Sequence, residues 1–161
     1  MIRNVTLDDA QRLAEIYNYY IESSVITFEE EQIAVSDMRE RIQYYSTANL
    51  PWLVFESGEN VLGFAYASLW RSRSAYRHSV ESTIYLDKDS LGQGVGTKLY
   101  AQLFEALSAL EFHIVIGGIA LPNEASVALH EKLGFEKVAH FKEVGFKHDR
   151  WIDVGYWQKS L

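Results

Sequence analysis

The sequence predicts a single α/β domain, residues 1–161, in which a mixed β-sheet carries helices on its faces. A chain of 161 residues with 48% hydrophobic and 23% charged residues fits one globular domain with a sizeable core. Apolar residues recur at helical spacing in some segments and form short strand-like runs in others, and the two kinds of segment interleave. No repeat, low-complexity stretch or Pro/Gly-rich linker divides the chain.

The first half of the chain is predicted to form two helices and then three strands. Thr6 resembles a helix N-cap followed by acidic residues, and apolar side chains then recur at helical spacing as far as Ile21. A second helix is expected to begin near Ser36, and the segment 49–51, which ends in a proline, interrupts it. Strands are expected at 52–56, 61–69 and 79–86, with a hairpin at 57–60 and room for a short strand at 2–5.

The second half is predicted to contain two helices and three strands. Leucines spaced along one side from Val95 to Leu110 indicate a long amphipathic helix. The apolar run 114–119 is typical of a buried strand, and Gly134 is suited to end a helix that spans 123–133. Two more strands are expected at 135–144 and 151–158.

Composition and charge exclude several classes of function. The formal net charge is −7, which argues against a sequence-independent grip on nucleic acid and requires local groups to bind any anionic cofactor. The chain has no cysteine, so disulfides, thiolate-bound zinc and a cysteine nucleophile are excluded. Its apolar runs are too short for a membrane span and its first residues do not resemble a signal peptide, so we expect a soluble, cytoplasmic protein with no membrane partner.

A glycine-rich loop between the third long strand and the following helix is the most informative stretch. It runs from Ile84 to Lys98 and places Gly92, Gly94 and Gly96 at alternate positions just before a helix. Glycines allow close backbone approach, and the first turn of a helix offers unpaired N–H groups, so together they favour a phosphate site. The spacing matches neither a P-loop nor a dinucleotide fingerprint, which leaves the pyrophosphate loop of an acyl-CoA enzyme or a turn that binds nothing.

The glycine loop and five further segments resemble the GNAT superfamily of N-acetyltransferases. Gly94 and Gly96 match the glycines of its [RQ]-x-x-G-x-[GA] signature, whereas Leu91 stands where the signature has Arg or Gln. The segments 27–30, 70–77, 80–82, 123–135 and 146–154 resemble, in order and spacing, the phosphinothricin and methionine sulfoximine N-acetyltransferase group.

The resemblance implies a GNAT fold, acetyl-CoA as co-substrate without a metal, a small amino-acid-like amine as acceptor, and a homodimer. It also implies which residues bind acetyl-CoA. Backbone groups of one strand would hold the pantetheine arm and the thioester carbonyl, the glycine loop would hold the pyrophosphate, and the next helix would add two polar contacts. These positions are, in that order, Ile84, Tyr85 and Leu86; Gly92, Gln93, Gly94, Val95, Gly96 and Thr97; Asn123 and Ser126.

Two titratable residues are candidates for proton transfer. Glu81 lies in an otherwise uncharged strand just before the thioester-binding segment, so it could remove the amine proton directly or through a water. A surface carboxylate or an ion pair with a nearby arginine would explain it equally simply. His130 stands where many GNAT enzymes carry a tyrosine that protonates the departing sulfur, and imidazole could do the same or act as a base. The alternative is an ordinary packed histidine.

The acceptor-binding candidates come from two loops. Arg71, Arg73 and Arg77 could hold the acidic end of an amino-acid-like acceptor, because guanidinium groups bind carboxylates and phosphinates in bidentate fashion. A solvated basic turn is the alternative. Tyr76 could pack on the acceptor. Phe28 and Glu29 could form a second wall, with the carboxylate attracting an ammonium group, or could be an ordinary aromatic beside a solvated acid.

Two other functions remain open at this point. The enzyme could act on another amine, such as a protein N-terminus, a polyamine or an aminoglycoside. The arginine-rich loop argues against polycationic amines, which need an acidic site. Alternatively, the chain could bind acyl-CoA without catalysis, although the presence of Glu81 and His130 argues against it.

Overall fold

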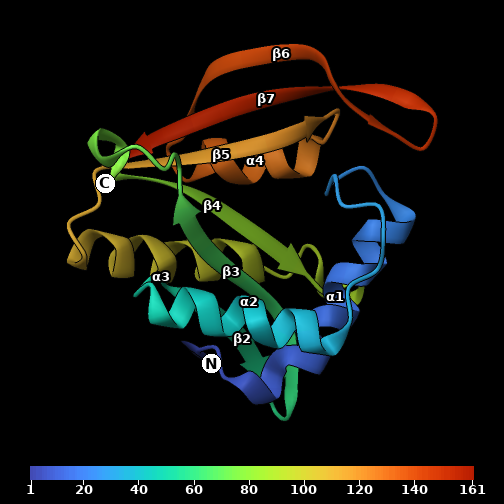
Figure 1. The fold of residues 1–161 in the computed structure, drawn as a ribbon, viewed down its shortest axis with the longest axis vertical. Helices are drawn as coiled ribbons and strands as arrows, with labels where there is room; N and C mark the ends of the chain where they lie inside the picture. Colours follow the sequence, from blue (N-terminus) through green and yellow to red (C-terminus); the bar gives the residue numbers. More distant parts are fainter.

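A computed structural model describes residues 1–161 and contains one seven-stranded sheet with helices on both faces (Figure 1). The strand order is β1-β2-β3-β4-β5-β7-β6, and every neighbouring pair is antiparallel except β4 and β5. The predicted mixed sheet flanked by helices is therefore confirmed. The elements in chain order are β1 (Ile2–Asn4), α1 (Ala10–Ser23), α2 (Val35–Thr47), β2 (Trp52–Ser57), β3 (Asn60–Leu69), β4 (Ser79–Leu86), α3 (Val95–Ala109), β5 (Ile114–Leu121), α4 (Glu124–Lys132), β6 (Glu136–Lys147) and β7 (Arg150–Ser160).

Several predicted bounds differ from the structure. The first helix is preceded by a 3-10 turn, Leu7–Asp9, and α1 itself begins at Ala10. Asp9 accepts a hydrogen bond from the Thr6 N–H at 2.7 Å, which satisfies one amide at the entry to this turn. At the other end of the chain, β6 continues past Gly145 to Lys147 and β7 extends from Arg150 to Ser160, so this hairpin is longer than predicted.

Alternation along the central strands builds two cores, one on each face of the sheet. In β2, Leu53 belongs to the core under α3, whereas Trp52 and Val54 belong to the core under α1 and α2. In β3, Ala65 and Phe64 divide in the same way. This period of two is what a sheet covered on both faces requires. Figure 1 shows α3 on one side of the central strands and α2 crossing the other.

The parallel pair β4–β5 separates partway along its length. Only three residue pairs join the two strands, and the last of them is Glu81 with Ile116. Beyond this point β4 continues to Leu86, while β5 pairs with β7 as far as Leu121. The strands therefore form a fork, and the backbone groups of β4 that face it lack a strand partner. None of the helices combines the length and apolarity needed to cross a membrane.

Candidate active site

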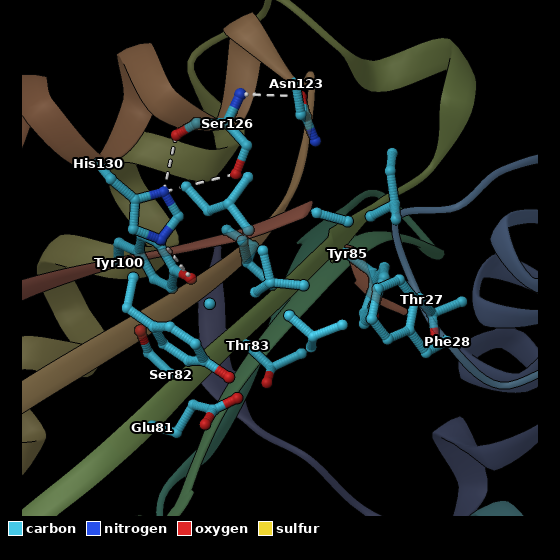
Figure 2. Close-up of a pocket in the computed structure, with 18 residues that line it drawn as sticks. Thr27, Phe28, Glu81, Ser82, Thr83, Tyr85, Tyr100, Asn123, Ser126 and His130 are labelled. Atoms are coloured by element: carbon cyan, nitrogen blue, oxygen red, sulfur yellow. Dashed lines mark hydrogen bonds between the residues drawn. The ribbon is translucent and has the colours of Figure 1, made fainter. Parts of the chain in front are cut away.

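A cavity of about 350 Å³ occupies the fork between β4 and β5. One side is β4 from Glu81 to Tyr85, and the other is β5 at 118–120. Helix α4 closes one end, and residues 26–28 of the connection between α1 and α2 close the other (Figure 2). The cavity thus brings together Phe28, Glu81 and His130, which are far apart in the sequence.

A second cavity, of about 320 Å³, leads from the fork to the start of α3. Ile84, Tyr85, Asn123 and Ser126 line both cavities, so the two adjoin. The second one is also lined by Leu86, Leu91, Gly92, Gly94, Val95, Gly96 and Thr97. Every predicted acetyl-CoA contact except Gln93 therefore lies on this continuous surface. The Gln93 side chain instead donates to the Asp89 carbonyl at 3.0 Å.

The start of α3 is a ready anion site. Gly92 and Gly94 have φ of 74° and 77°, a left-handed conformation that glycine adopts without strain. Lys98 is the first helical residue whose N–H bonds to the turn, to the Gly94 carbonyl at 3.2 Å. The N–H groups of the three residues before it have no protein partner, and they lie at the positive end of the helix dipole. No lining residue is basic, so backbone groups would bind a pyrophosphate here.

Glu81 lies at the point of the fork. The pKa of its carboxyl is raised by burial, and the nearby positive charge of Arg71 partly offsets this. No hydrogen bond or ion pair within the protein holds the carboxylate, and it lines the fork cavity. A carboxyl in this setting can accept a proton from a bound amine once it is ionised.

His130 is buried, with 3% of its surface exposed, and packs against two aromatic rings of the core. Its Nδ1 lies 2.7 Å from the Ser126 carbonyl oxygen, which only accepts, so this nitrogen carries a proton. Burial lowers the pKa of His130, which leaves the ring neutral and its Nε2 without a proton near neutral pH. That nitrogen faces the Tyr100 hydroxyl at 3.4 Å (Figure 2).

Tyr100 and Ser82 were not identified from the sequence, yet both line the fork cavity. Tyr100 lies on the buried side of α3, and burial raises the pKa of its phenol, with Ser82 beside it partly offsetting the shift. The only signal in the sequence is a tyrosine on an otherwise leucine-rich helical face, which ordinary core packing explains equally well.

The predicted acceptor-binding residues separate into two groups. Phe28 lines the fork cavity, and Arg71 lies close enough to Glu81 to influence the pKa of that carboxyl. By contrast Arg73, Tyr76 and Arg77 are exposed on or beside a 3-10 turn, and they do not line this cavity.

Glu29 also lies apart from the fork. Its carboxylate pairs with Arg41, with Oε1 2.5 Å from Nη2 and Oε2 3.0 Å from Nη1. Arg41 also holds the pKa of Glu29 below its usual value. Because this charge is already paired, it is a weaker attractor for an ammonium group than the sequence suggested. No group of three or more His, Cys, Asp or Glu side chains is arranged to hold a metal ion.

A family model described as an acetyltransferase (GNAT) domain matches residues 2–155. The chain is 40% identical over 164 residues to a phosphinothricin N-acetyltransferase of Streptomyces viridochromogenes, covering 99% of this chain and 87% of that protein.

Two solved structures are similar over the whole chain. A ribosomal-protein-alanine N-acetyltransferase from Brucella melitensis superposes with a TM-score of 0.98 at 33% identity, covering 100% of this chain and 99% of that one. A phosphinothricin acetyltransferase from Sinorhizobium meliloti in complex with acetyl-CoA gives a TM-score of 0.96 at 35% identity, covering 100% and 88%.

Proposed function

Because the chain belongs to the GNAT family of acetyltransferases, we propose that it moves the acetyl group of acetyl-CoA to the amine of a small amino-acid-like acceptor by direct attack in a ternary complex. The family relationship shows that the protein is an acetyl-CoA-dependent acetyltransferase. What we propose is the class of its acceptor and the chemical steps of the transfer. The observation that supports it most strongly is the position of Glu81 at the point of a fork whose other end opens onto the start of α3.

Bound acetyl-CoA supplies an activated acetyl thioester, and the residues of the fork bind it and orient the amine. The free N–H groups at the start of α3 would hold its pyrophosphate, and the backbone groups of 84–86 would hold the pantetheine arm and the thioester. A backbone N–H near Tyr85 or Leu86 stabilises charge that develops on the carbonyl oxygen. Asn123 contributes through the start of α4, where its side chain accepts the Ser126 N–H at 3.1 Å.

Glu81 acts as the general base in this proposal. An amine must lose its proton before or during attack, and the raised pKa brings the carboxyl closer to the range in which a base works well near neutral pH. The positive charge of Arg71 partly offsets the effect of burial and favours the ionised carboxyl, and Arg71 lies where it could also bind the acid group of the acceptor. Phe28 forms the opposite wall.

His130 fixes the position of the Tyr100 hydroxyl group. Its Nε2 accepts from the Tyr100 hydroxyl, while its Nδ1–H is fixed by the Ser126 carbonyl. Burial keeps the phenol protonated, and Tyr100 can give this one proton to the departing thiolate when its hydroxyl turns from His130 Nε2 toward the fork cavity. We therefore refine the expected role of His130 from a direct proton donor to the residue that orients the donor. A thiol has a pKa of roughly 8.5, so its departure needs only modest help from an acid.

A panel of amines tests the proposal. Thiol release from acetyl-CoA is measured with methionine sulfone, methionine sulfoximine, phosphinothricin, spermidine, an aminoglycoside and a peptide that begins with alanine. We expect the amino-acid-like acceptors to be acetylated far faster than the polycationic amines. A preference for the peptide would favour a protein N-terminus as acceptor, the activity in the name of the Brucella structure. Binding of acetyl-CoA without turnover of any amine would favour a non-catalytic module.

We also propose a homodimer formed through the edge of the sheet. Strand β6 is the last in the strand order, and it and its partner β7 carry a set of exposed apolar side chains. Unpaired edges and exposed apolar patches are typical of interfaces. The residues are Val138, Phe141, Val144, Phe146 and Trp151. Light scattering would test the dimer.

We propose in addition that residues 1–161 form a single domain and that the protein is cytoplasmic.

A further inference from the structure

A third cavity, of about 710 Å³, lies on the α1–α2 side of the sheet and is larger than either cavity at the fork. Helices α1 and α2 form its walls and strands β2, β3 and β4 form its floor. Figure 1 shows α2 crossing this face of the strands. The chemistry described above makes no use of this space.

The floor of the cavity is a stack of aromatic rings. The Trp52 ring lies 4.4 Å from that of Tyr66, at an interplanar angle of 23°, and 5.8 Å from that of Phe64, at 30°. Tyr45 of α2 stands edge-on to Trp52 and Tyr66, with ring centroids 5.3 and 5.0 Å away. Together these side chains give the cavity an aromatic lining, against which an apolar ring can pack in an offset or edge-to-face arrangement.

The strand register connects this floor with the proposed base. Residues two apart on a strand share a face, and directly paired residues on antiparallel strands lie side by side. In β3 and β4, Ser68 pairs with Glu81 and Phe64 pairs with Tyr85. Glu81 therefore projects from the same face of the sheet as the aromatic floor. Tyr85 lines both this cavity and the fork cavity, so the two spaces share a wall.

The polar groups of the cavity favour a neutral occupant over an anionic one. Its one guanidinium, that of Arg41, is already paired with Glu29, and the carboxylates of Asp37 and Glu40 add uncompensated negative charge to the lining. An anionic side chain would find no free cation here.

We propose that this cavity is the side-chain subsite of the acceptor and that it takes an apolar aromatic side chain. The inference rests on the proposed function, because it places the reactive amine at Glu81 and directs the side chain along the shared face toward Trp52. It also names a substrate class that differs from the anionic side chain of phosphinothricin. Amino acids with an aryl side chain are the acceptors that fit the ring stack.

Steady-state kinetics at saturating acetyl-CoA tests the subsite. In the unmodified protein we expect kcat/KM for L-phenylalanine to exceed that for phosphinothricin by about tenfold or more. Tyr45→Ala should lower the ratio of kcat/KM for L-phenylalanine to that for methionine sulfone by about tenfold, without changing the KM for acetyl-CoA. Tyr19→Ala is the matched control, because this tyrosine is 43% exposed on α1 and does not line the cavity.

Two further measurements distinguish a misfolded variant or a lack of turnover from an absent subsite. If Tyr45→Ala does not fold, Tyr44→Ala replaces it, since this ring lines the cavity and is 64% exposed. Equilibrium dialysis of L-phenylalanine without acetyl-CoA measures binding apart from turnover. Methionine sulfone acetylation without acetylation or binding of L-phenylalanine would overturn the subsite, as would an unchanged ratio in the folded variant. The protein could instead bind L-phenylalanine and acetylate no amine. If Tyr45→Ala then abolished this binding, the result would support the subsite and contradict the proposed function.

Discussion

Replacing Gly117 with alanine should displace His130 without changing any atom of the histidine. A Cβ at position 117 would lie 2.7 Å from His130 Nε2 and 2.8 Å from its Cδ2, well inside ordinary van der Waals contact. The ring has little room to yield. Its Nδ1 is bound to the Ser126 carbonyl at 2.7 Å, and the rings of Tyr100 and Phe135 pack beside it at 5.3 and 5.0 Å between centroids.

The expected cost is that of overpacking a core, about 1–3 kcal/mol. For a chain of this length, such a loss lowers the Tm by roughly 2–12 °C. The same displacement separates His130 Nε2 from the Tyr100 hydroxyl, so kcat should fall by about 10- to 100-fold, because misplacement of a positioned group by about 1 Å can cost that much. The KM for acetyl-CoA should change little, since the start of α3 is untouched.

Differential scanning calorimetry and steady-state kinetics on Gly117→Ala, His130→Ala and the double variant measure both effects. In the His130→Ala background the ring is absent, so Gly117→Ala should cost little further stability. An equal loss of Tm in both backgrounds would refute the packing argument. A Gly117→Ala enzyme with lower Tm but full kcat would show that the position of the His130 ring does not matter for the reaction.

Three further changes probe other parts of the site. Gly94→Val places a β-branched residue at φ 77°, which should weaken acetyl-CoA binding measured by calorimetry by about tenfold or more, and unchanged affinity would contradict the phosphate site. Arg71→Gln removes the positive charge that lowers the pKa of Glu81, so the acidic limb of the kcat/KM profile should move to higher pH, and a shift to lower pH would be the wrong sign. Lys147→Met removes the hydrogen bond from the buried ammonium to the Thr27 carbonyl at 2.8 Å. It should raise the KM for the acceptor by about 5- to 30-fold, or about 1–2 kcal/mol, with a smaller change for acetyl-CoA, and equal changes in both would point to general destabilisation.

Most of the fold could be predicted because its signals are local. The helical spacing in α1 and α3 and the strand-like runs of β3 to β5 are strong, and their order leaves few arrangements. The β6–β7 hairpin was underestimated because Gly145 resembles a strand end. In the structure it is a point of close approach, where a Cβ would lie 2.4 Å from the Phe28 ring. The turn beyond it has two residues of positive φ, His148 and Asp149, which allow a tight connection.

The candidate site was only partly predictable, because tertiary packing and not local spacing brings its residues together. Block resemblance pointed to Glu81 and His130, and the structure brings both to one cavity. It could not reveal Tyr100, whose position depends on the packing of α3 against α4. Arg71 and Arg73 are neighbours in one loop, but Arg71 lies near Glu81 whereas Arg73 is exposed and does not line the cavity. Their closeness in the sequence could not predict this difference. Directions of side chains in loops depend on tertiary contacts that local spacing does not encode.

The central claim is that Glu81 removes the proton of an amino-acid-like amine, and the pH dependence of Glu81→Gln tests it most directly. At saturating acetyl-CoA and methionine sulfone, the variant should lose about 10²- to 10⁴-fold in kcat near neutral pH. Acetyl-CoA affinity should stay near that of the unmodified protein. The loss should shrink as pH rises, because more of the amine is then already neutral. A variant that keeps full kcat from about pH 6 to 9 would contradict the claim and leave positioning of the two substrates as the source of the rate.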